Sequence, residues 1–310
     1  MSLDNSYDLV IIGAGPTALT TAIYTTREDI DTLLIEKGAV GGMASVTDLI
    51  DNYPGFSKGI SGLELSEELA KQAERFGAKI EYDEIKTLTD EGRVKLLQGV
   101  SEQYRAKAVL IATGTDYKKI GVPGEVEYLS RGVHYCATCD GAFYRDRPIA
   151  VVGGGNSAIQ ETLFLTRYAS SIDLLVRSTI KASDVLQKEL QKYIDNGKVK
   201  VHLGTNIVRI MGENNLVNKI EINQNGATSI LNIDGVFVFV GLFPNTAFLK
   251  GIVELDERNF IKTNQDLETN IPGVFAAGDV RSGATMQIAS ASGEGATVAL
   301  KIRQYLERNK

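Results

Sequence analysis

Two glycine-rich turns, each lying between an apolar run and a helix-forming stretch, constrain the fold of this chain more than any other feature. The first lies in Tyr7–Glu28 (YDLVIIGAGPTALTTAIYTTRE) and the second in Pro148–Arg167 (PIAVVGGGNSAIQETLFLTR). Each is followed by another strand-like run, TLLIEK and IDLLVR respectively. The pattern predicts two β-α-β units with parallel strands, because a parallel pair needs a crossover connection. Their spacing of about 140 residues indicates a duplication at domain scale, well beyond the period of solenoid repeats.

The length of 310 residues suits about two domains of ordinary size. Further apolar runs that end in glycine turns lie at 108–116, 234–246 and 272–281. We therefore expect an α/β fold with two Rossmann-like (three-layer ββα) dinucleotide-binding domains, the second inserted in the first. The expected bounds are 1–116 with 247–310 for a discontinuous domain that contains the first glycine turn, and 117–246 for an inserted domain that contains the second glycine turn and both cysteines.

Charge and hydropathy exclude several classes of protein. The net charge is −6, which argues against a nucleic-acid partner, because phosphate binding needs clustered Lys and Arg. No apolar run approaches the roughly 20 residues of a membrane span. The start of the chain, MSLDNSYD, lacks a basic-then-apolar signal pattern. We therefore expect a cytoplasmic protein, in which thiols are kept reduced and a close cysteine pair is more often catalytic than structural.

The only two cysteines, Cys136 and Cys139, lie three residues apart in HYCATCDGAF. This spacing suits a reversible dithiol/disulfide or half of a zinc site. Zinc needs four ligands, and the chain has no third cysteine and only two histidines, His134 and His202. The sequence therefore favours a redox pair and no metal. Two inert buried thiols are the alternative, and the acid that follows at once, Asp140, argues against them.

The first glycine turn has the pattern of a dinucleotide site. Gly13 permits a tight turn, Gly15 lets the backbone approach a pyrophosphate, and Ala18 allows close helix packing in GxGxxA. The phosphates would then meet the positive end of a helix. Glu36 ends the next strand, where an acid binds a ribose hydroxyl and repels a 2′-phosphate. NADP is thus disfavoured here, and FAD or NAD remain.

Four more motifs bear on whether the first glycine turn binds FAD or NAD. They are Gly41-Gly42-Met43, Asn52-Tyr53-Pro54-Gly55, Ala112-Thr113-Gly114 and Gly278-Asp279. Together with Cys136–Gly141 (CATCDG), in this order, they resemble the low-molecular-weight thioredoxin reductases over essentially the whole chain. The resemblance implies an FAD enzyme in which electrons pass from a donor to FAD, then to the CxxC disulfide, then to thioredoxin. It also implies a homodimer and an inserted domain that rotates on two connections, near 115–119 and 243–246.

The resemblance assigns roles to individual residues. Cys139 is the sulfur next to the flavin, Cys136 attacks the disulfide of the partner, and Asp140 is the acid/base. From the sequence, His134 could lower the pKa of a thiol, but a surface or packing role is favoured because a single histidine without a partner says little. The residues implied in FAD binding are Gly13, Gly15, Pro16, Thr17, Glu36, Lys37, Gly42, Met43, Asn52, Ala112, Thr113, Gly114, Gly278, Asp279, Gln287, Ile288 and Ala289.

The second glycine turn departs from the family. Its nicotinamide cradle would consist of Gly153, Gly155, Asn156, Ser157 and Ala158, with Arg177 and Lys181 as cations. Members that use NADPH carry H-R-R-x-x-x-R after the next strand, whereas this chain reads VRSTIK at 176–181. Without the Arg pair a 2′-phosphate is held weakly. NADPH is therefore slightly disfavoured as the electron donor, although it could still bind through these two cations. NADH could replace it. Alternatively, the cradle could be vestigial and reduced ferredoxin could be the donor.

Further departures and alternatives remain. Met43 and Met286 stand where many members carry Gln and Arg near the flavin. A ferredoxin–NADP reductase of similar architecture is a second hypothesis, although such relatives lack the CxxC pair. A dithiol oxidase and a flavin-bound redox sensor are the other hypotheses.

Overall fold

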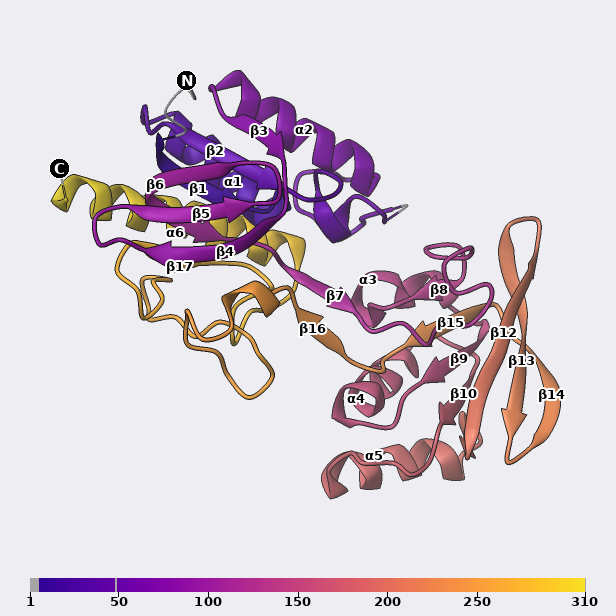
Figure 1. Ribbon diagram of the computed structural model, residues 1–310. Coiled ribbons are helices and arrows are strands. Elements are labelled where there is room, and N and C mark those ends of the chain that lie inside the picture. Colours follow the sequence, from indigo (N-terminus) through magenta and orange to yellow (C-terminus); the bar gives the residue numbers. More distant parts are fainter. Residues whose placement is uncertain (1–5, 48, 310) are drawn as a thin grey trace. The chain divides into compact units, whose positions relative to one another are not determined.

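The computed structural model describes residues 6–47 and 49–309. The chain divides into two compact units, Met1–Asp116 with Phe243–Lys310, and Tyr117–Leu242. We call them the first and the second unit and describe each by itself. Figure 1 shows that the second unit is a continuous stretch inserted between the two parts of the first.

The first unit is built on a sheet of seven strands in the order β3-β2-β1-β6-β5-β4, with β17 also paired to β6. Strands β1, β2, β3, β6 and β17 run parallel to one another, whereas β5 pairs in antiparallel fashion with both β4 and β6. The strands are β1 Ser6–Ile12, β2 Thr32–Glu36, β3 Lys79–Tyr82, β4 Ile85–Asp90, β5 Lys95–Gly99, β6 Gln103–Ile111 and β17 Val274–Ala276.

The central strands of this sheet are apolar because both of their faces are covered. Alternate residues of β1 serve two cores: Leu9 and Ile11 face the helices, and Val10 and Ile12 face β4, β5 and the segment 248–261. The helices are α1 Pro16–Thr26, α2 Gly62–Arg75 and α6 Ile288–Arg308, with the short 3₁₀ helices η1 Gly42–Ala44 and η3 Ala247–Leu249.

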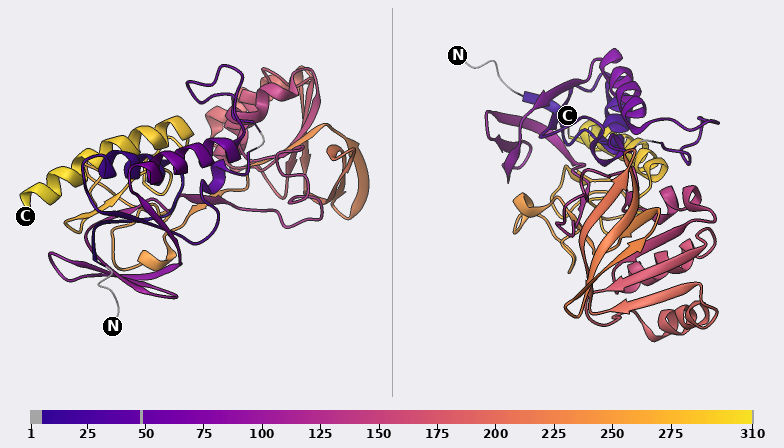
Figure 2. Two further views of the ribbon diagram at one scale, coloured as in Figure 1. Left: turned by 90° about the horizontal axis from the view of Figure 1, so that it is seen from above. Right: turned by 90° about the vertical axis from the view of Figure 1, so that its right-hand side faces the viewer.

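Helices α1 and α6 lie side by side on this sheet, as both views of Figure 2 show. A glycine makes their approach possible, because a Cβ at Gly295 would lie 2.6 Å from the Thr17 carbonyl oxygen. The Thr21 hydroxyl donates to the Gly295 carbonyl oxygen at 3.1 Å. Close packing of α6 on α1 places the C-terminal part of the chain beside the first glycine turn.

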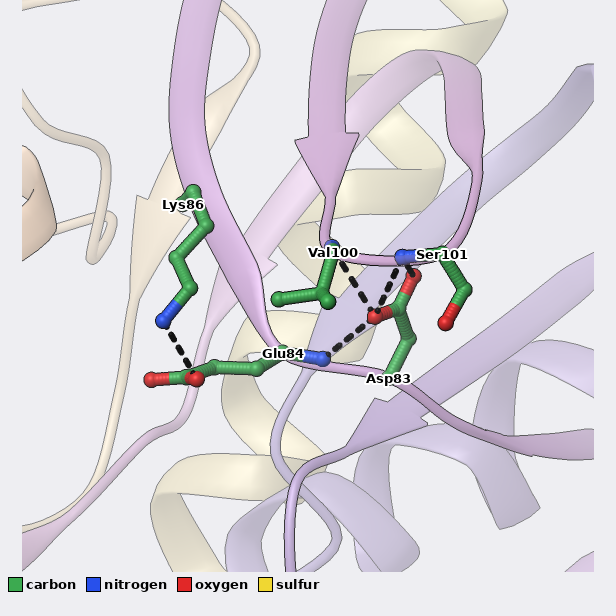
Figure 3. A network of polar contacts seen from close by, with 5 residues as sticks. All are labelled: Asp83, Glu84, Lys86, Val100 and Ser101. Carbon is green, nitrogen blue, oxygen red and sulfur yellow. Dashed lines mark hydrogen bonds and ion pairs between the residues drawn. The ribbon is translucent and has the colours of Figure 1, made fainter.

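A buried carboxylate fastens the antiparallel part of the sheet. Asp83 accepts hydrogen bonds from the backbone N–H groups of Glu84, Val100 and Ser101 at 2.7 to 3.2 Å (Figure 3). It also accepts from the Glu102 N–H and the Tyr104 hydroxyl. Burial alone would raise the pKa of Asp83, but these hydrogen bonds outweigh it and lower the pKa. The neighbouring Lys86–Glu84 ion pair in Figure 3 is exposed, so we expect it to contribute little.

Asp83→Asn is expected to destabilise the protein by about 2 to 3 kcal/mol, because an amide offers one acceptor atom to donors that now meet a charged carboxylate. Since the folded state lowers the pKa of Asp83, its contribution is complete above the unfolded pKa of about 3.9 and is lost as the pH falls through the folded pKa. Urea unfolding of both proteins between neutral and acidic pH tests this. The difference should shrink as the pH falls; a difference that is constant with pH would contradict the assignment.

The second unit has three layers. Its central sheet of five parallel strands has the order β11-β10-β9-β15-β8. The strands are β8 Val133–His134, β9 Pro148–Val152, β10 Ser171–Val176, β11 Val199–Leu203 and β15 Gly235–Val238; the helices are α3 Ala137–Asp140, α4 Asn156–Leu165 and α5 Asp184–Asp195, with η2 Gly141–Tyr144. An antiparallel sheet of β12 Thr205–Glu213, β13 Leu216–Gln224 and β14 Ala227–Asn232 forms the third layer.

Alternation along β9 again separates two cores. Ile149 and Val151 pack with α4 and α5, whereas Ala150 packs with Ile220 and Ile222 of β13 on the opposite face. Figure 1 shows α4 and α5 on one side of the central sheet and β12–β14 on the other. The predicted α/β class, with parallel sheets and two β-α-β units, is confirmed.

The two segments that join the units pair with each other. They are β7 Thr115–Tyr117 and β16 Leu242–Pro244, which form a two-stranded sheet. The bound expected at residue 247 needs a correction, since 243–246 belong to the first unit. The reason is local: the Asn245 amide donates to the Thr113 carbonyl oxygen at 3.0 Å, and the Thr246 hydroxyl donates to the Asn259 carbonyl oxygen at 2.8 Å.

Candidate active site

The two cysteines are joined as a disulfide at the start of a short helix. Their sulfurs are 2.13 Å apart and their Cα atoms 5.3 Å apart. Cys136 is in an extended conformation immediately before α3, and its Sγ accepts a hydrogen bond from the Cys139 N–H at 3.2 Å. Both cysteines are half-buried, whereas Thr138 between them is exposed. The sulfurs thus form the pair that a CxxC redox motif requires, at a place that is not sealed from solvent.

Asp140, the expected acid/base, ends α3. Its carboxylate Oδ2 lies 3.1 Å from Nδ1 of His134, and the other ring nitrogen of His134 lies 2.6 Å from the Tyr144 hydroxyl. His134 is buried, with 6% of its surface exposed. It therefore has more than the surface or packing role expected from the sequence, because it also bonds to the acid of the redox motif.

The first glycine turn has the geometry of a phosphate cradle. Gly13 has a φ of 107°, and a Cβ there would lie 2.5 Å from the Ala112 carbonyl oxygen. A Cβ at Gly15 would meet nothing within 4 Å. Gly15 precedes Pro16, the first residue of α1, and no side chain caps this helix. The first N–H groups of α1 therefore face open space beside Gly15, as anion binding requires.

Glu36 lies at the end of β2 beside this turn. One of its carboxylate oxygens accepts from the Ala14 N–H at 2.8 Å and the other from the Gly38 N–H at 2.7 Å. These bonds fix the carboxylate and leave lone pairs for a ribose hydroxyl. The Gly41 N–H donates to the Ala14 carbonyl oxygen at 2.8 Å, so the loop that carries Gly42 and Met43 is tied to the same turn.

The C-terminal segment brings a carboxyl group to the cradle. Gly278 has a φ of 77°, and a Cβ there would lie 2.3 Å from the Thr17 hydroxyl. The Gly278 N–H donates to Glu294 at 2.8 Å, and Glu294 also forms an ion pair with Arg281. Burial, assisted by the negative charge of Glu294, raises the pKa of Asp279 to about 6. A carboxyl group in this environment is suited to accept a hydroxyl hydrogen bond from a ligand.

The other predicted flavin contacts lie on three segments of the same unit. The Asn52 amide donates to the Gln287 side chain at 3.2 Å, which joins the loop of a pocket of about 420 Å³ at 51–57 to the start of α6. Ile288 and Ala289 begin α6. Thr113 and Asn245 exchange two hydrogen bonds at the end of β6. The remaining members are placed as follows: Ala112 and Gly114 flank Thr113, and Lys37 follows Glu36.

The residues present fit FAD. Three features lie within one unit. The uncapped helix start beside the open glycine matches a pyrophosphate, the fixed carboxylate of Glu36 matches a ribose, and the half-buried carboxyl group of Asp279 matches a polyol chain. Sequence reasoning missed Glu294, Asn245 and Tyr144. No local pattern could have found them. Glu294 and Asn245 bond to residues far away in the sequence, Gly278 and Thr113, and Tyr144 bonds to His134 across the cysteine motif.

The second glycine turn is also fully formed. Gly153 has a φ of 143°, and a Cβ there would lie 2.7 Å from the Ala158 Cβ, which explains the small residue at that position. Gly155 faces open space before α4, whose first residues are Asn156 and Ser157. The Lys181 N–H donates to the Gly154 carbonyl oxygen at 2.6 Å, so the segment after β10 folds against the turn.

The cations of this cradle are few. Arg177 and Lys181 are both exposed, and within the described residues neither has an ion-pair partner. Glu161 on α4 is half-buried, and burial raises its pKa. The second unit therefore has the backbone of a dinucleotide cradle with two separate cations in place of a guanidinium pair.

Other kinds of site were also sought. In residues 6–47 and 49–309 there is no cluster of His, Cys, Asp and Glu that could hold a metal ion. None of the helices described there is both long and apolar enough to cross a membrane.

Comparisons with known proteins agree with this geometry. The family model "Pyridine nucleotide-disulphide oxidoreductase" matches residues 7–295. A protein of Bacillus subtilis named thioredoxin reductase is 40% identical over 310 residues, which cover 99% of this chain and 97% of the relative. One of Treponema pallidum with the same name is 36% identical over 98% of this chain and 99% of the relative. The crystal structure of thioredoxin reductase from Streptococcus pyogenes superposes with a TM-score of 0.94 at 37% identity, covering 99% of this chain and 100% of that one.

Proposed function

The chain belongs to the pyridine nucleotide-disulphide oxidoreductase family, and we propose that it is an FAD-dependent thioredoxin-disulfide reductase. The observation that carries this proposal is the disulfide between Cys136 and Cys139, half-buried at the start of α3, in a chain similar along its whole length to proteins named thioredoxin reductase. A disulfide of this kind can exchange with a disulfide of another protein.

The first unit is proposed to hold FAD and the second to present the cysteine pair. Glu36 would bind the ribose, the start of α1 the pyrophosphate, and Asp279 the polyol chain. Bound FAD would supply the two electrons that reduce the disulfide. The paired strands β7 and β16 are the connection on which the second unit would move between the flavin and the partner.

The exchange with thioredoxin uses residues of this chain alone. The Cys136 thiolate attacks one sulfur of the thioredoxin disulfide, which forms a mixed disulfide and releases a thiolate on thioredoxin. That thiolate takes a proton from the Asp140 carboxyl group. The Asp140 carboxylate then takes the proton of the Cys139 thiol. The Cys139 thiolate attacks the Cys136 sulfur, which breaks the mixed disulfide and releases the second sulfur of thioredoxin as a thiolate. Two electrons pass to thioredoxin, the disulfide of this chain re-forms, and Asp140 ends as it began.

Reduction of thioredoxin tests this function. The reduced protein should convert one thioredoxin disulfide to a dithiol per chain, and continuous turnover should follow when a donor is present. A flavin-bound redox sensor would change its own thiol state without such turnover. A yellow protein that never reduces thioredoxin would rule out the proposal.

The electron donor is proposed to be reduced ferredoxin in preference to NADPH, because Arg177 and Lys181 lack the guanidinium pair that grips a 2′-phosphate. Under anaerobic conditions, reduced ferredoxin is expected to bleach the flavin at concentrations at which NADPH and NADH do not. Ser178→Arg, which restores an adjacent Arg pair, is expected to lower the NADPH concentration needed by about tenfold.

Stopped-flow absorbance of the flavin is the measurement. Ser229→Arg, at an exposed position of β14, is the matched control for added positive charge. Complete bleaching of the unchanged protein by micromolar NADPH would contradict the proposed donor and leave the disulfide reductase activity standing.

A further inference from the structure

A buried string of three polar side chains lies behind the cysteine pair. Asp140 Oδ2 is 3.1 Å from His134 Nδ1, and His134 Nε2 is 2.6 Å from the Tyr144 hydroxyl. The side chains of His134 and Asp140 are 6% and 14% exposed. Asp140 is also fixed through its backbone, because its N–H donates to the Cys136 carbonyl oxygen at 3.2 Å. A change in the protonation of Asp140 therefore changes its hydrogen bond with His134.

The ring of His134 is held by two aromatic rings and by the pairing of its backbone. It lies on β8, where it pairs with Phe237 of β15, and it stacks on the Phe237 ring with centroids 5.1 Å apart. The Tyr144 ring meets both of them edge-on, at 5.2 and 5.3 Å. Gly235 makes room for Tyr144, since a Cβ there would lie 2.3 Å from that ring. With the ring fixed, its two nitrogens keep separate partners.

The hydrogen bonds of the string are satisfied in two protonation states. Burial raises the pKa of Tyr144, the charges of Asp140 and Asp234 add to this, and Arg147 opposes it, so the phenol stays protonated. When His134 is neutral, the phenol donates to Nε2 and Nδ1–H donates to the Asp140 carboxylate. When the ring gains a proton, Nε2–H donates to the phenol oxygen instead, and Nδ1–H still donates to Asp140.

We propose that His134 is a positioning residue for Asp140, which holds the carboxyl group beside the cysteine pair and shares the proton that this group gives and takes during disulfide exchange. The inference rests on the proposed function. In the exchange, Asp140 gives a proton to the thiolate of the partner and regains one from the Cys139 thiol. Before the first transfer and after the second, the proton is shared between Asp140 and His134. In between, Asp140 is a carboxylate, and the Nδ1–H of His134 donates to it.

The chain contains its own control. His202, the only other histidine, is also buried and bonds an acid, with Nε2 2.6 Å from Asp173 Oδ1. This pair spans the neighbouring strands β10 and β11, neither of which carries a cysteine. It shares the chemistry of the first pair but not its place beside the redox motif.

The first experiment is histidine NMR on the intact holoprotein labelled with ¹⁵N in its two histidine rings. Neutral His134 is expected to carry its proton on Nδ1. Asp140→Asn is expected to move the ¹⁵N signals of the His134 ring, because the carboxylate that accepts the Nδ1 proton is replaced by an amide. Reduction of the disulfide is expected to shift the signals of His134 and leave those of His202 in place. Asp173→Asn should move only His202.

The second experiment follows single-turnover oxidation of the prereduced protein by thioredoxin disulfide across pH. His134→Phe, which keeps an aromatic ring against Phe237, is expected to slow the reaction about tenfold and to remove one inflection of the pH profile. His134→Asn, which keeps a donor for Asp140 but cannot take a proton, should recover part of the rate and not the inflection. Tyr144→Phe, which changes only the other end of the string, should shift the inflection with little loss of rate.

The outcomes separate the two ideas. If His134→Phe and His134→Asn keep the rate and pH profile of the unchanged protein, or if Asp140→Asn leaves the His134 signals unmoved, the role of His134 is overturned while thioredoxin reduction stands. If the unchanged protein fails to reduce thioredoxin, the proposed function is wrong. The role of His134 toward Asp140 can then still be tested by the reaction of the dithiol with a small aromatic disulfide. Should His134→Phe not fold, the Tyr144→Phe profile and the NMR signals of His134 decide.

Discussion

Cys136→Ser is expected to abolish thioredoxin reduction, by a factor of about 10⁴ or more, while the bound flavin remains reducible. A serine hydroxyl does not ionise at neutral pH, so the nucleophile that opens the disulfide of the partner is lost. The fold should be unaffected, because Ser is close in size to Cys and replaces a half-buried sulfur that accepts a hydrogen bond from the Cys139 N–H. A steady-state assay with thioredoxin measures the loss of thioredoxin reduction, and the anaerobic absorbance of the flavin measures its reduction separately.

Cys139→Ser is the matched variant, and it should fail in a different way. Cys136 keeps its thiol and should react rapidly with a small aromatic disulfide, but no second sulfur is present to resolve the product. A stable mixed disulfide of one reagent group per chain should appear by mass spectrometry. The same trapped product in Cys136→Ser, or turnover above background in either variant, would overturn the assignment of Cys136 as the outward nucleophile.

The parts of the fold that could be predicted are those in which the backbone geometry of a turn allows only glycine and the sequence has glycine there. Gly13 and Gly153 adopt φ values of 107° and 143° in turns where a Cβ would strike a backbone carbonyl oxygen. Glycine at these places, between a buried strand and a helix, leaves few folds other than a β-α-β unit. The resemblance to the low-molecular-weight thioredoxin reductases, which rested on the order of such motifs, is confirmed by 40% identity over the full chain.

The parts that could not be predicted depend on pairs of residues brought together by the tertiary structure. Asp83 gathers donors from residues 84 and 100–104, and nothing in its own neighbourhood distinguishes it from any other surface acid. His134 gave no sign of its bond to Asp140, because a lone histidine two residues before a cysteine is compatible with packing alone. The bound expected at 247 differs for the same reason from the point at Phe243 where the first unit resumes, since Asn245 is bonded to 113–114.

Gly13→Ala and Gly15→Ala are expected to differ in their effect on folding and to share a loss of flavin binding. Gly13 has a φ of 107°, and an added methyl would lie 2.5 Å from the Ala112 carbonyl oxygen and 3.0 Å from its carbon. Neither atom can move, because Ala112 directly follows β6 at the centre of the sheet. We expect Gly13→Ala to destabilise the apoprotein by about 3 kcal/mol or more, and to lose flavin because the cradle is deformed.

Gly15 separates cofactor approach from folding. Its φ of −77° and ψ of −178° are open to any residue, and a Cβ there meets no protein atom within 4 Å. Urea unfolding of flavin-free Gly15→Ala should therefore agree with the unchanged protein within about 0.5 kcal/mol. A methyl group at this point fills the space through which a pyrophosphate reaches the first N–H groups of α1, so flavin affinity should fall at least about tenfold in a fluorescence titration. Undiminished flavin binding by a stable Gly15→Ala protein would mean that the pyrophosphate does not lie at this turn. A phosphate crowded by the added methyl group could not move to the other side of the turn, because Gly13 and the Ala112 carbonyl group lie against each other there.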